Sequence, residues 1–557
     1  MSSLTVALPR ALRRGDRSRV AARRVPRRWP IESTFLFLVS FIVYMAVADY
    51  LVIHLHYTNA DAYTRVADAT YVLYSRDPHL GAIGFIWPPL PGLLNIPILA
   101  LQHWFPFLIN HAFAGSVQAA LFGAGSVVLI NLGLRRAGVI LPVRWLVLAV
   151  WIANPMTALY SAQGMSEAPF VFFVIASLLS FIRWTDSRKP GELAALGVLV
   201  GLGTLVRVEM IPMAIAVGAG VFVCSLAKKT SWRQLETQML LYALPAVFLF
   251  ALWIGSTWVI ERDPLYIFHS SYSQQAAATG GFGASAVGNF TQWHNVVSYI
   301  GLQYLQLFPA VVVLVAAVAV RTLVARDRRP GLVLLGLALP VPLVDMYLLH
   351  SGNLPLILRY QIYVIPYTMV LGIFLLKEFG RVSPRVVSVA ALLLVAVVGI
   401  SNMSSFQLMS DVQRAPEESV AILAAENNVS AGAVNNQMDP YDSAIAVAQS
   451  VALADKDHGL IAMDTFRGSA VYMTAPDRST YVVTSDEDFE AVVNQPQVYH
   501  VEYFLVPKPE GESTLDHINQ LYPTLWANGD NFATKVAEIG GQLHWRLYRI
   551  TGVTGRA

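Results

Sequence analysis

Eleven apolar runs follow one another between about residue 33 and residue 403, and no other feature constrains the fold so strongly. A run of about 20 apolar residues crosses a bilayer as one α-helix, because a helix satisfies its own backbone hydrogen bonds there. Charged residues make up only 13% of the 557 residues, whereas a soluble domain usually carries about 25%. The sequence therefore predicts a polytopic α-helical membrane protein.

The charges of the loops predict the side of the membrane that each loop faces. Lys and Arg in short loops mark the cytoplasmic side. Every basic cluster falls on that side if the spans lie at about 33–54, 111–134, 139–155, 167–184, 192–207, 209–226, 238–260, 298–324, 331–349, 360–377 and 385–403. We therefore expect a basic cytoplasmic tail at 1–32, a membrane domain at 33–403 and an extracytoplasmic domain at 404–557.

The first 30 residues are strongly basic. They hold nine arginines against one acid, Asp16. Because an apolar span follows at once, we interpret this segment as a cytoplasmic tail that touches anionic lipid, and we expect no nucleic-acid partner. The apolar stretch at 33–53 is longer than a signal-peptide core and lacks a cleavage site. Abundant Arg and Ala without a cleavable signal suit a bacterial inner membrane.

The segment Phe85–Phe107 is apolar enough to be a twelfth span, but it contains four prolines between Pro88 and Pro97. Proline removes backbone donors and prevents one continuous helix. Counting this segment as a span would also reverse the sidedness of every later basic loop. We interpret it as a re-entrant or interfacial element on the outer side.

Three charged residues follow the first span at helical spacing. Asp61, Arg65 and Asp68 stand at i, i+4 and i+7 and share one face of a helix. A carboxylate at the membrane surface can accept a proton from a hydroxyl group, and the arginine can hold an anion or tune the acid. An ordinary i,i+4 ion pair on an interfacial helix explains the same spacing equally well.

Two further segments carry polar groups between spans. In "NPMTALYSAQGMSEAPF", Ser166 is a candidate helix cap and Glu167 lies in the first helical turn. In "TLVRVEMIP", Arg207 and Glu209 interrupt an apolar stretch where two spans meet. Ionisable groups at membrane depth are costly, so they pair or serve a site. An Arg–Glu clamp between two helices and a ligand contact remain alternatives here.

The segment "VDMYLLHSGNLPLILRYQIYVIP" holds the last candidate residues. Asp345 lies within a predicted span, His350 at its outer end, and Arg359 at the start of the next span. A planar guanidinium at that depth suits a phosphate at headgroup level. Simple snorkelling of Arg359 fits less well, because an outward-facing arginine runs against the positive-inside bias.

Together these segments resemble the GT-C class of membrane glycosyltransferases. The resemblance rests on "NADAYTRVADA", on "FIWPPLPG" with Trp87, on "NPMTALYSAQGMSEAPF", on "LVRVEM" and on "LRYQIYVIP", and it covers about 33–403. Within the class, the segments are similar to those of polyprenyl-phosphate-dependent mannosyltransferases and aminoarabinose transferases. Each motif is loose, but their order and predicted sidedness agree.

The resemblance implies an inverting transfer of a hexose or pentose from a polyprenyl phosphate to a hydroxyl group of a glycan, lipid or protein on the outer face. Asp61 matches the general base. Arg359, with Arg207, His350 and Arg65, is expected to neutralise the lipid phosphate. The expected substrate contacts are Asp68, Trp87, Glu167, Glu209 and Asp345. Some members of the class have paired acids in the first loop, whereas Ala62 follows Asp61 here, so we expect no obligatory metal and no cofactor.

After about residue 404 the chain has the composition of a soluble domain. The segments "GLIAMDTF", "STYVVTS", "VEYFLVPKP" and "HWRLYRITG" predict strands, and "PYDSAIAVAQSVALADKD" and "STLDHINQLYPTLWANGDNFATKVAEI" predict amphipathic helices. The sequence thus predicts a small α/β domain. The acids at Asp457 and Asp464 fit a turn better than a metal site.

Two other classes of function fit parts of the sequence. A lipid or solute transporter or flippase usually has internal repeats and discontinuous helices near the midplane, whereas here no repeat is evident and the polar groups gather at one face. A non-catalytic receptor or assembly protein that acts through its tail is the other alternative.

Overall fold

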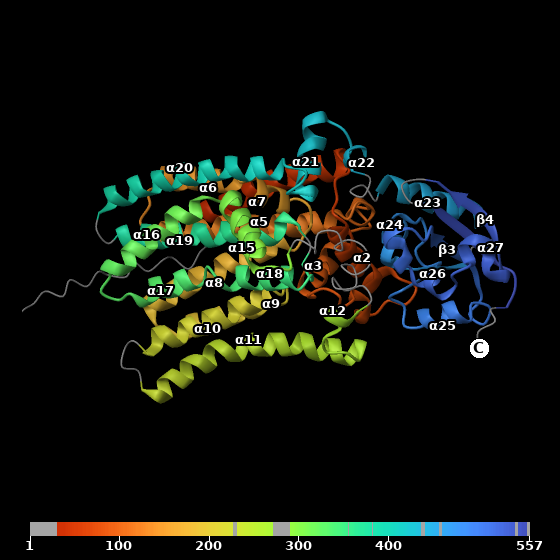
Figure 1. Ribbon diagram of the computed structural model, residues 1–557, viewed down its shortest axis with the longest axis horizontal. Coiled ribbons are helices and arrows are strands. Elements are labelled where there is room, and N and C mark those ends of the chain that lie inside the picture. Colours follow the sequence, from red (N-terminus) through yellow and green to blue (C-terminus); the bar gives the residue numbers. More distant parts are fainter. Residues whose placement is uncertain are drawn as a thin grey trace, which may run out of the picture.

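The computed structural model describes residues 31–226, 231–270, 290–354, 356–380, 383–435, 441–455, 459–540 and 544–553. The basic segment at 1–30 and Asp457 lie outside the described residues. The described chain forms a long helical bundle with an α/β domain at one end (Figure 1). It is a multi-pass membrane protein.

Within the part of the chain that the structure describes, seven helices are long and apolar enough to cross a membrane. They are α1 with its π-helical continuation η2 (Ile31–Ala48 and Asp49–His54), α5 (Phe113–Arg136), α8 (Glu167–Ser187), α11 (Trp232–Glu261), α17 with α18 (Arg329–Gly336 and Pro340–His350), η5 with α19 (Leu358–Tyr363 and Val364–Gly380), and α20 (Pro384–Met409). Each coincides with a predicted span.

The other four predicted spans are also helical but depart from one straight helix of full length. Three are short: α6 (Leu141–Ile152), α9 (Pro190–Thr204) and α10 (Met210–Leu226). The twelve residues of α6 rise only about 18 Å at 1.5 Å per residue, less than the hydrocarbon thickness of about 30 Å. The segment predicted as one span at 298–324 is instead α15 (Trp293–Leu307) and α16 (Ala310–Val324), bent by 92°. Pro309 lies at this break and removes a backbone donor there.

The proline-rich segment forms no span, as predicted. It contains η3 (Leu80–Ile83), α3 (Leu90–Leu99) and α4 (Phe107–Asn110). Its irregular backbone is satisfied inside the protein: Leu90 N donates to Leu205 O over 2.9 Å, and Gln118 Nε2 of α5 donates to Pro91 O over 2.6 Å. Irregular backbone at this depth is stable because such partners replace water.

The C-terminal domain is built on a mixed five-stranded sheet of order β2-β1-β3-β5-β4. Strand β1 is parallel to β2 and β3, and the β3–β5 and β5–β4 pairs are antiparallel. The strands are β1 (Leu460–Met463), β2 (Tyr481–Val483), β3 (Val501–Pro507), β4 (Ala533–Ile539) and β5 (Trp545–Ile550). The helices of this part of the chain are α21 (Pro416–Asn427), α22 (Ala431–Val434), α23 (Tyr441–Ala454), α24 (Thr465–Thr474), α25 (Phe489–Asn494), α26 (His517–Leu521) and α27 (Leu525–Asn528). The predicted α/β domain is confirmed.

One prediction within this domain is wrong. The segment predicted as one helix up to Ile539 instead contains the short helices α26 and α27, the second of which ends at Asn528, and β4 follows. Gly529, Asp530 and Asn531 take positive φ angles there, a conformation that ends a helix and reverses the chain. Strand β4 is an edge strand paired with β5 alone, so the pairing overrides its helix-favouring Ala, Lys and Glu residues.

The C-terminal domain docks on helix α2 (Ala60–Tyr74). The rings of Tyr71 and Tyr472 meet edge to face with centroids 4.9 Å apart, and the Tyr472 hydroxyl donates to Tyr74 O over 3.0 Å. Beyond the end of α2, Arg76 Nε lies 3.3 Å from Asp486 Oδ2. The helix that carries Asp61 at its first turn is therefore held at its last turn by the C-terminal domain.

Candidate active site

Helix α2 positions Asp61 at the end of the bundle that faces the C-terminal domain (Figure 1). The helix begins after Asn59, whose side chain accepts a hydrogen bond from Asp61 N over 3.0 Å. Arg65, one turn later, donates to the backbone oxygen of Asp61 over 3.2 Å and not to its carboxylate. The carboxylate instead accepts a hydrogen bond from Arg359 Nη2 over 2.7 Å. Asp61 therefore does not form the alternative i,i+4 ion pair with Arg65. It pairs with Arg359, which is 298 residues away in the sequence.

Arg359 lies at the centre of the site. It belongs to η5, a buried 3-10 turn that leads into α19. Besides Asp61, Glu417 Oε2 lies 3.3 Å from its Nη1 and Glu167 Oε1 lies 3.9 Å from its Nε. Its side chain is 6% exposed, so three carboxylates surround one buried guanidinium.

Arg207 forms a second, more enclosed group in the turn between α9 and α10. Its Nη2 lies 2.5 Å from Glu209 Oε1, and its Nη1 pairs with the Glu167 carboxylate. Ser166 precedes α8 as expected, but its side chain makes no capping bond; its hydroxyl oxygen accepts from Arg207 over 3.4 Å. The structure contains the Arg–Glu clamp, and a ligand contact of these two residues stays a prediction. Glu167, which lies between both arginines, joins the two groups.

Aromatic rings cover the cations. The Arg65 guanidinium lies 4.7 Å from the ring centroid of Trp87, and the Tyr360 ring lies between Arg207 and Arg359 at 5.4 Å and 5.7 Å. Such contacts stabilise a cation while they keep water from its faces. They leave the edges of the guanidinium groups for anions.

Two acids of the site are not among the residues predicted from the sequence. Glu417 and Glu418 begin α21, which follows the last long apolar helix. The Tyr160 hydroxyl donates to Glu418 Oε1 over 2.6 Å, and the Tyr57 hydroxyl donates to the backbone oxygen of Glu417 over 3.1 Å. Acids behind a proline are typical of any first helical turn, so the sequence carries no signal that sets these two apart.

Two buried carboxylate oxygens of this group, Glu167 Oε2 and Glu418 Oε2, accept no hydrogen bond from any described residue. Leaving a buried acceptor unfilled is costly. Sugars are rich in hydroxyl donors, so these oxygens suit a carbohydrate ligand.

The charges of the site do not balance. Arg65, Arg207 and Arg359 face Asp61, Glu167, Glu209, Glu417 and Glu418, so carboxylates exceed arginines by two. Burial by itself would raise the pKa of Asp61, but Arg359 and Arg65 outweigh it and hold that pKa below its usual value. Burial raises the pKa of Glu417, and its neighbours Glu418, Asp61 and Glu167 add to the effect.

The remaining predicted residues lie outside this group. Asp68, two turns into α2, is half-buried and forms no ion pair with an arginine of the described chain. Asp345 accepts a hydrogen bond from the Tyr304 hydroxyl over 3.1 Å. His350 stacks on Trp293 with ring centroids 4.1 Å apart. The structure does not bring these three side chains to Arg359.

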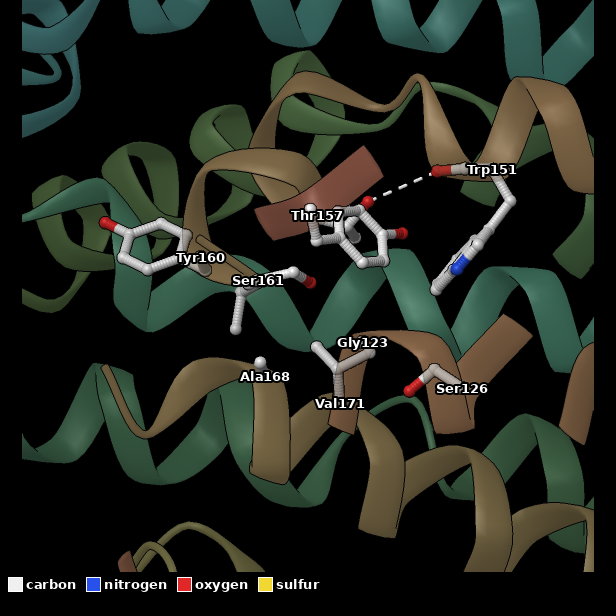
Figure 2. Close-up of a pocket in the computed structure, with 10 residues that line it drawn as sticks. Gly123, Ser126, Trp151, Thr157, Tyr160, Ser161, Ala168 and Val171 are labelled. Atoms are coloured by element: carbon white, nitrogen blue, oxygen red, sulfur yellow. Dashed lines mark hydrogen bonds between the residues drawn. The ribbon is translucent and has the colours of Figure 1, made fainter. Parts of the chain in front are cut away.

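A small cavity lies beside the charged group and not within it. Figure 2 shows its lining, which includes Gly123, Tyr160, Ser161 and Ala168. The Tyr160 hydroxyl points away from the cavity (Figure 2), toward its partner Glu418. The cavity lies among α1, α5, α6, α7 (Pro155–Tyr160) and α8, and Tyr160 separates it from the acids.

Comparisons with known proteins find similarity in structure alone. No protein-family model matches the chain, and no curated protein matches it in sequence. The fold is similar to that of ArnT from Cupriavidus metallidurans bound to undecaprenyl phosphate, with a TM-score of 0.54, 14% sequence identity, and coverage of 92% of this chain and 97% of that chain. The apo structure of the same protein matches with a TM-score of 0.51 at the same identity and coverage. The resemblance to the GT-C class is thus confirmed at the level of the fold: the chain has the fold of a GT-C membrane protein.

Proposed function

We propose that the protein is an inverting glycosyltransferase that moves a sugar from a polyprenyl phosphate to an acceptor hydroxyl group on the outer face of the membrane. The observation that carries the proposal is the pairing of Arg359 with Asp61 at the outer end of a GT-C fold. A cation that suits a phosphate and a carboxylate that suits a hydroxyl proton lie side by side there.

In this mechanism the acceptor oxygen attacks the anomeric carbon of the sugar. The bond from that carbon to the phosphate oxygen breaks, the lipid phosphate leaves with the electron pair, and Asp61 takes the hydroxyl proton. Because attack and departure occur on opposite faces, the anomeric configuration inverts. Arg359 stabilises the charge that grows on the phosphate, which is where a fixed cation accelerates a reaction most.

Donor binding also prepares the base. In the empty site, Arg359 lowers the pKa of Asp61, which makes it a weak base. A phosphate beside Arg359 competes for the same positive charge, so the pKa of Asp61 rises when the donor is present. Asp61 is then a stronger base in the loaded site than in the empty one.

Other charged residues of the site support the reaction. Arg65, held over Trp87, is the second cation within reach of the phosphate. Arg207 has two glutamate partners and acts as a support for Glu167. The unfilled oxygen of Glu167 accepts from a sugar hydroxyl group. Direct contacts of Asp68, Asp345 and His350 with substrate remain predictions.

Sidedness supports the same reaction. The loop between α16 and α17 lies at the end of the bundle away from the C-terminal domain (Figure 1), and this segment is basic, with Arg321, Arg326, Arg328 and Arg329. By the positive-inside rule that end is cytoplasmic, so Asp61 and the C-terminal domain face the outside of a bacterial inner membrane. A lipid-linked donor and an envelope acceptor meet on that side.

The test is turnover of a panel of polyprenyl phosphate sugars (mannose, glucose, galactose and arabinose) by the purified protein, with cell-envelope extract as acceptor and release of polyprenyl phosphate as readout. We expect one donor to be consumed, and Asp61→Asn to lower the rate by about 10²–10⁴-fold, the usual contribution of a general base. Asp477→Asn, which changes an exposed carboxylate of the C-terminal domain, is the matched control and leaves the rate unchanged.

Three other results would each change the proposal. Equal turnover by a well-folded Asp61→Asn variant would keep the class of reaction and remove Asp61 as the base. Loss of turnover on adding EDTA would overturn the expectation that no metal is required. Consumption of no donor would favour a transporter, and uptake of labelled lipid by proteoliposomes would then be measured.

A further inference from the structure

We propose that Glu417 is an exchangeable counter-ion, which holds Arg359 while the site is empty and gives it up, as a protonated acid, to the phosphate of the lipid donor. The inference rests on the function proposed above. It concerns a residue outside the membrane helices, at the start of α21.

The exchange follows from how Arg359 is occupied. Each of its two terminal nitrogens faces a carboxylate: Nη2 lies 2.7 Å from Asp61 and Nη1 lies 3.3 Å from Glu417. A phosphate binds an arginine through the same nitrogens. A phosphate at Arg359 therefore competes with Asp61 for Nη2 or with Glu417 for Nη1.

Glu417 is the carboxylate that is held most weakly. Glu167 is fully buried and also pairs with Arg207. Asp61 is fixed by a capped helix and makes the short hydrogen bond. Glu417 Oε2, in contrast, lies 3.3 Å from Arg359 Nη1 and has no aligned hydrogen bond.

The reaction geometry also selects Glu417. If the phosphate displaced Asp61, the base would lose its position at the moment it is needed. If the phosphate takes Nη1 in place of Glu417, Asp61 stays beside Nη2. Leaving group and base then lie on different nitrogens of one guanidinium.

Charge favours the departure of Glu417 as a neutral acid. The charged groups that face it are Arg359 from η5, Asp61 from α2, Glu167 from α8 and Glu418 on its own helix, and the Tyr57 hydroxyl donates to its backbone oxygen. Adding a phosphate to a site that already has excess carboxylates would be unfavourable unless one of them took up a proton. Burial raises the pKa of Glu417 to about 7, so proton uptake there costs little near neutral pH.

The test measures lipid binding against pH in the full-length purified protein. The probe is the methyl phosphodiester of undecaprenol, whose single negative charge is constant between pH 6 and pH 8.5. Because binding takes up one proton, we expect the affinity of the wild type to fall by about tenfold per pH unit above the pKa of Glu417. Glu417→Gln mimics the protonated acid, so at pH 8.5 it should bind the probe at least about tenfold more tightly than the wild type does. Its affinity for the probe should not depend on pH.

Glu426→Gln is the matched control, since it alters an exposed glutamate of the same helix and should keep the pH dependence of the wild type. Glu417→Ala replaces Glu417→Gln if the latter does not fold. A wild-type affinity that is independent of pH, or a pH dependence that persists in the folded Glu417 variant, overturns the inference.

Arg359→Ala separates this inference from the proposed function. If it abolishes probe binding while the Glu417 variants behave as the wild type, the donor site stands and only the exchange is wrong. If Arg359→Ala and the wild type bind the probe equally well, Arg359 does not hold the phosphate, and both proposals fail.

Discussion

Arg207 and Arg359 are both buried, but their partners give them different tasks. Arg207 pairs with Glu167 and Glu209, so its charge is neutralised by side chains of the protein. Arg359 shares its terminal nitrogens with two partly exposed carboxylates, so a ligand can compete for it. Both residues are arginines next to predicted membrane spans, so the sequence does not distinguish them. Their ion-pair partners decide which of the two can bind a ligand.

This difference predicts that Arg207→Ala is primarily a stability mutation. It leaves Glu167 and Glu209 buried without their partner, and breaking such a pair costs about 3–5 kcal/mol. Thermal unfolding in detergent should show a large decrease in the transition temperature.

Arg183→Ala is the matched control, because its pair with Glu192 is half exposed on the arginine side and exposed pairs contribute about 0–1 kcal/mol. If both variants unfold at the same temperature, Arg207 is not the support that its contacts indicate.

At the scale of elements, the turn between α7 and α8 depends on one close contact. Gly164 has a φ of +79°, and a Cβ atom placed there would lie 2.9 Å from the carbonyl carbon of Gly115 on α5. Only glycine allows both the left-handed conformation and this approach. Met165, Ser166 and Glu167 follow at once, so the contact sets the position of the Glu167 carboxylate.

Gly164→Ala is therefore expected to lower both the unfolding temperature and turnover. The left-handed conformation alone costs an L-residue about 1–2 kcal/mol, and the contact with α5 adds to it. Gly138→Ala separates the two effects, since Gly138 has a φ of +85° but open space around its Cβ position. Equal losses in the two variants would mean that conformation alone matters and that the approach to α5 does not.

The sequence predicts an element correctly where the pattern of residues within the segment determines it. It fails where contacts with another segment determine the element. A run of apolar residues is a property of the segment itself, and all eleven predicted segments are helical. Strand β4 exists because β5 lies beside it, and the 92° break between α15 and α16 involves one proline within a continuous apolar run. Neither feature changes the local pattern enough to be recognised.

At the scale of the whole molecule, the basic loops and the C-terminal domain lie at opposite ends of the bundle (Figure 1). This arrangement predicts that a membrane-impermeant maleimide labels Ser479→Cys on intact spheroplasts and leaves Ser187→Cys unlabelled until the cells are opened. Both positions are exposed, in the C-terminal domain and at the end of α8 respectively. The only native cysteine, Cys224, is buried and is replaced by serine in both proteins as the control background. The reverse pattern of labelling would place Asp61 in the cytoplasm and contradict the proposed reaction.

The sequence by itself determined the membrane helices, the break in the proline-rich segment, the α/β character of the tail, and Asp61, Arg359, Arg207 and Glu167 as residues of interest. Those inferences depend on composition and spacing within single segments. Only the tertiary structure decided that Asp61 pairs with Arg359 and not with Arg65, that Glu417 and Glu418 join them, and that His350 and Asp345 do not. The physical reason is that ion pairs and burial depend on distances between segments hundreds of residues apart, and those distances are set by packing.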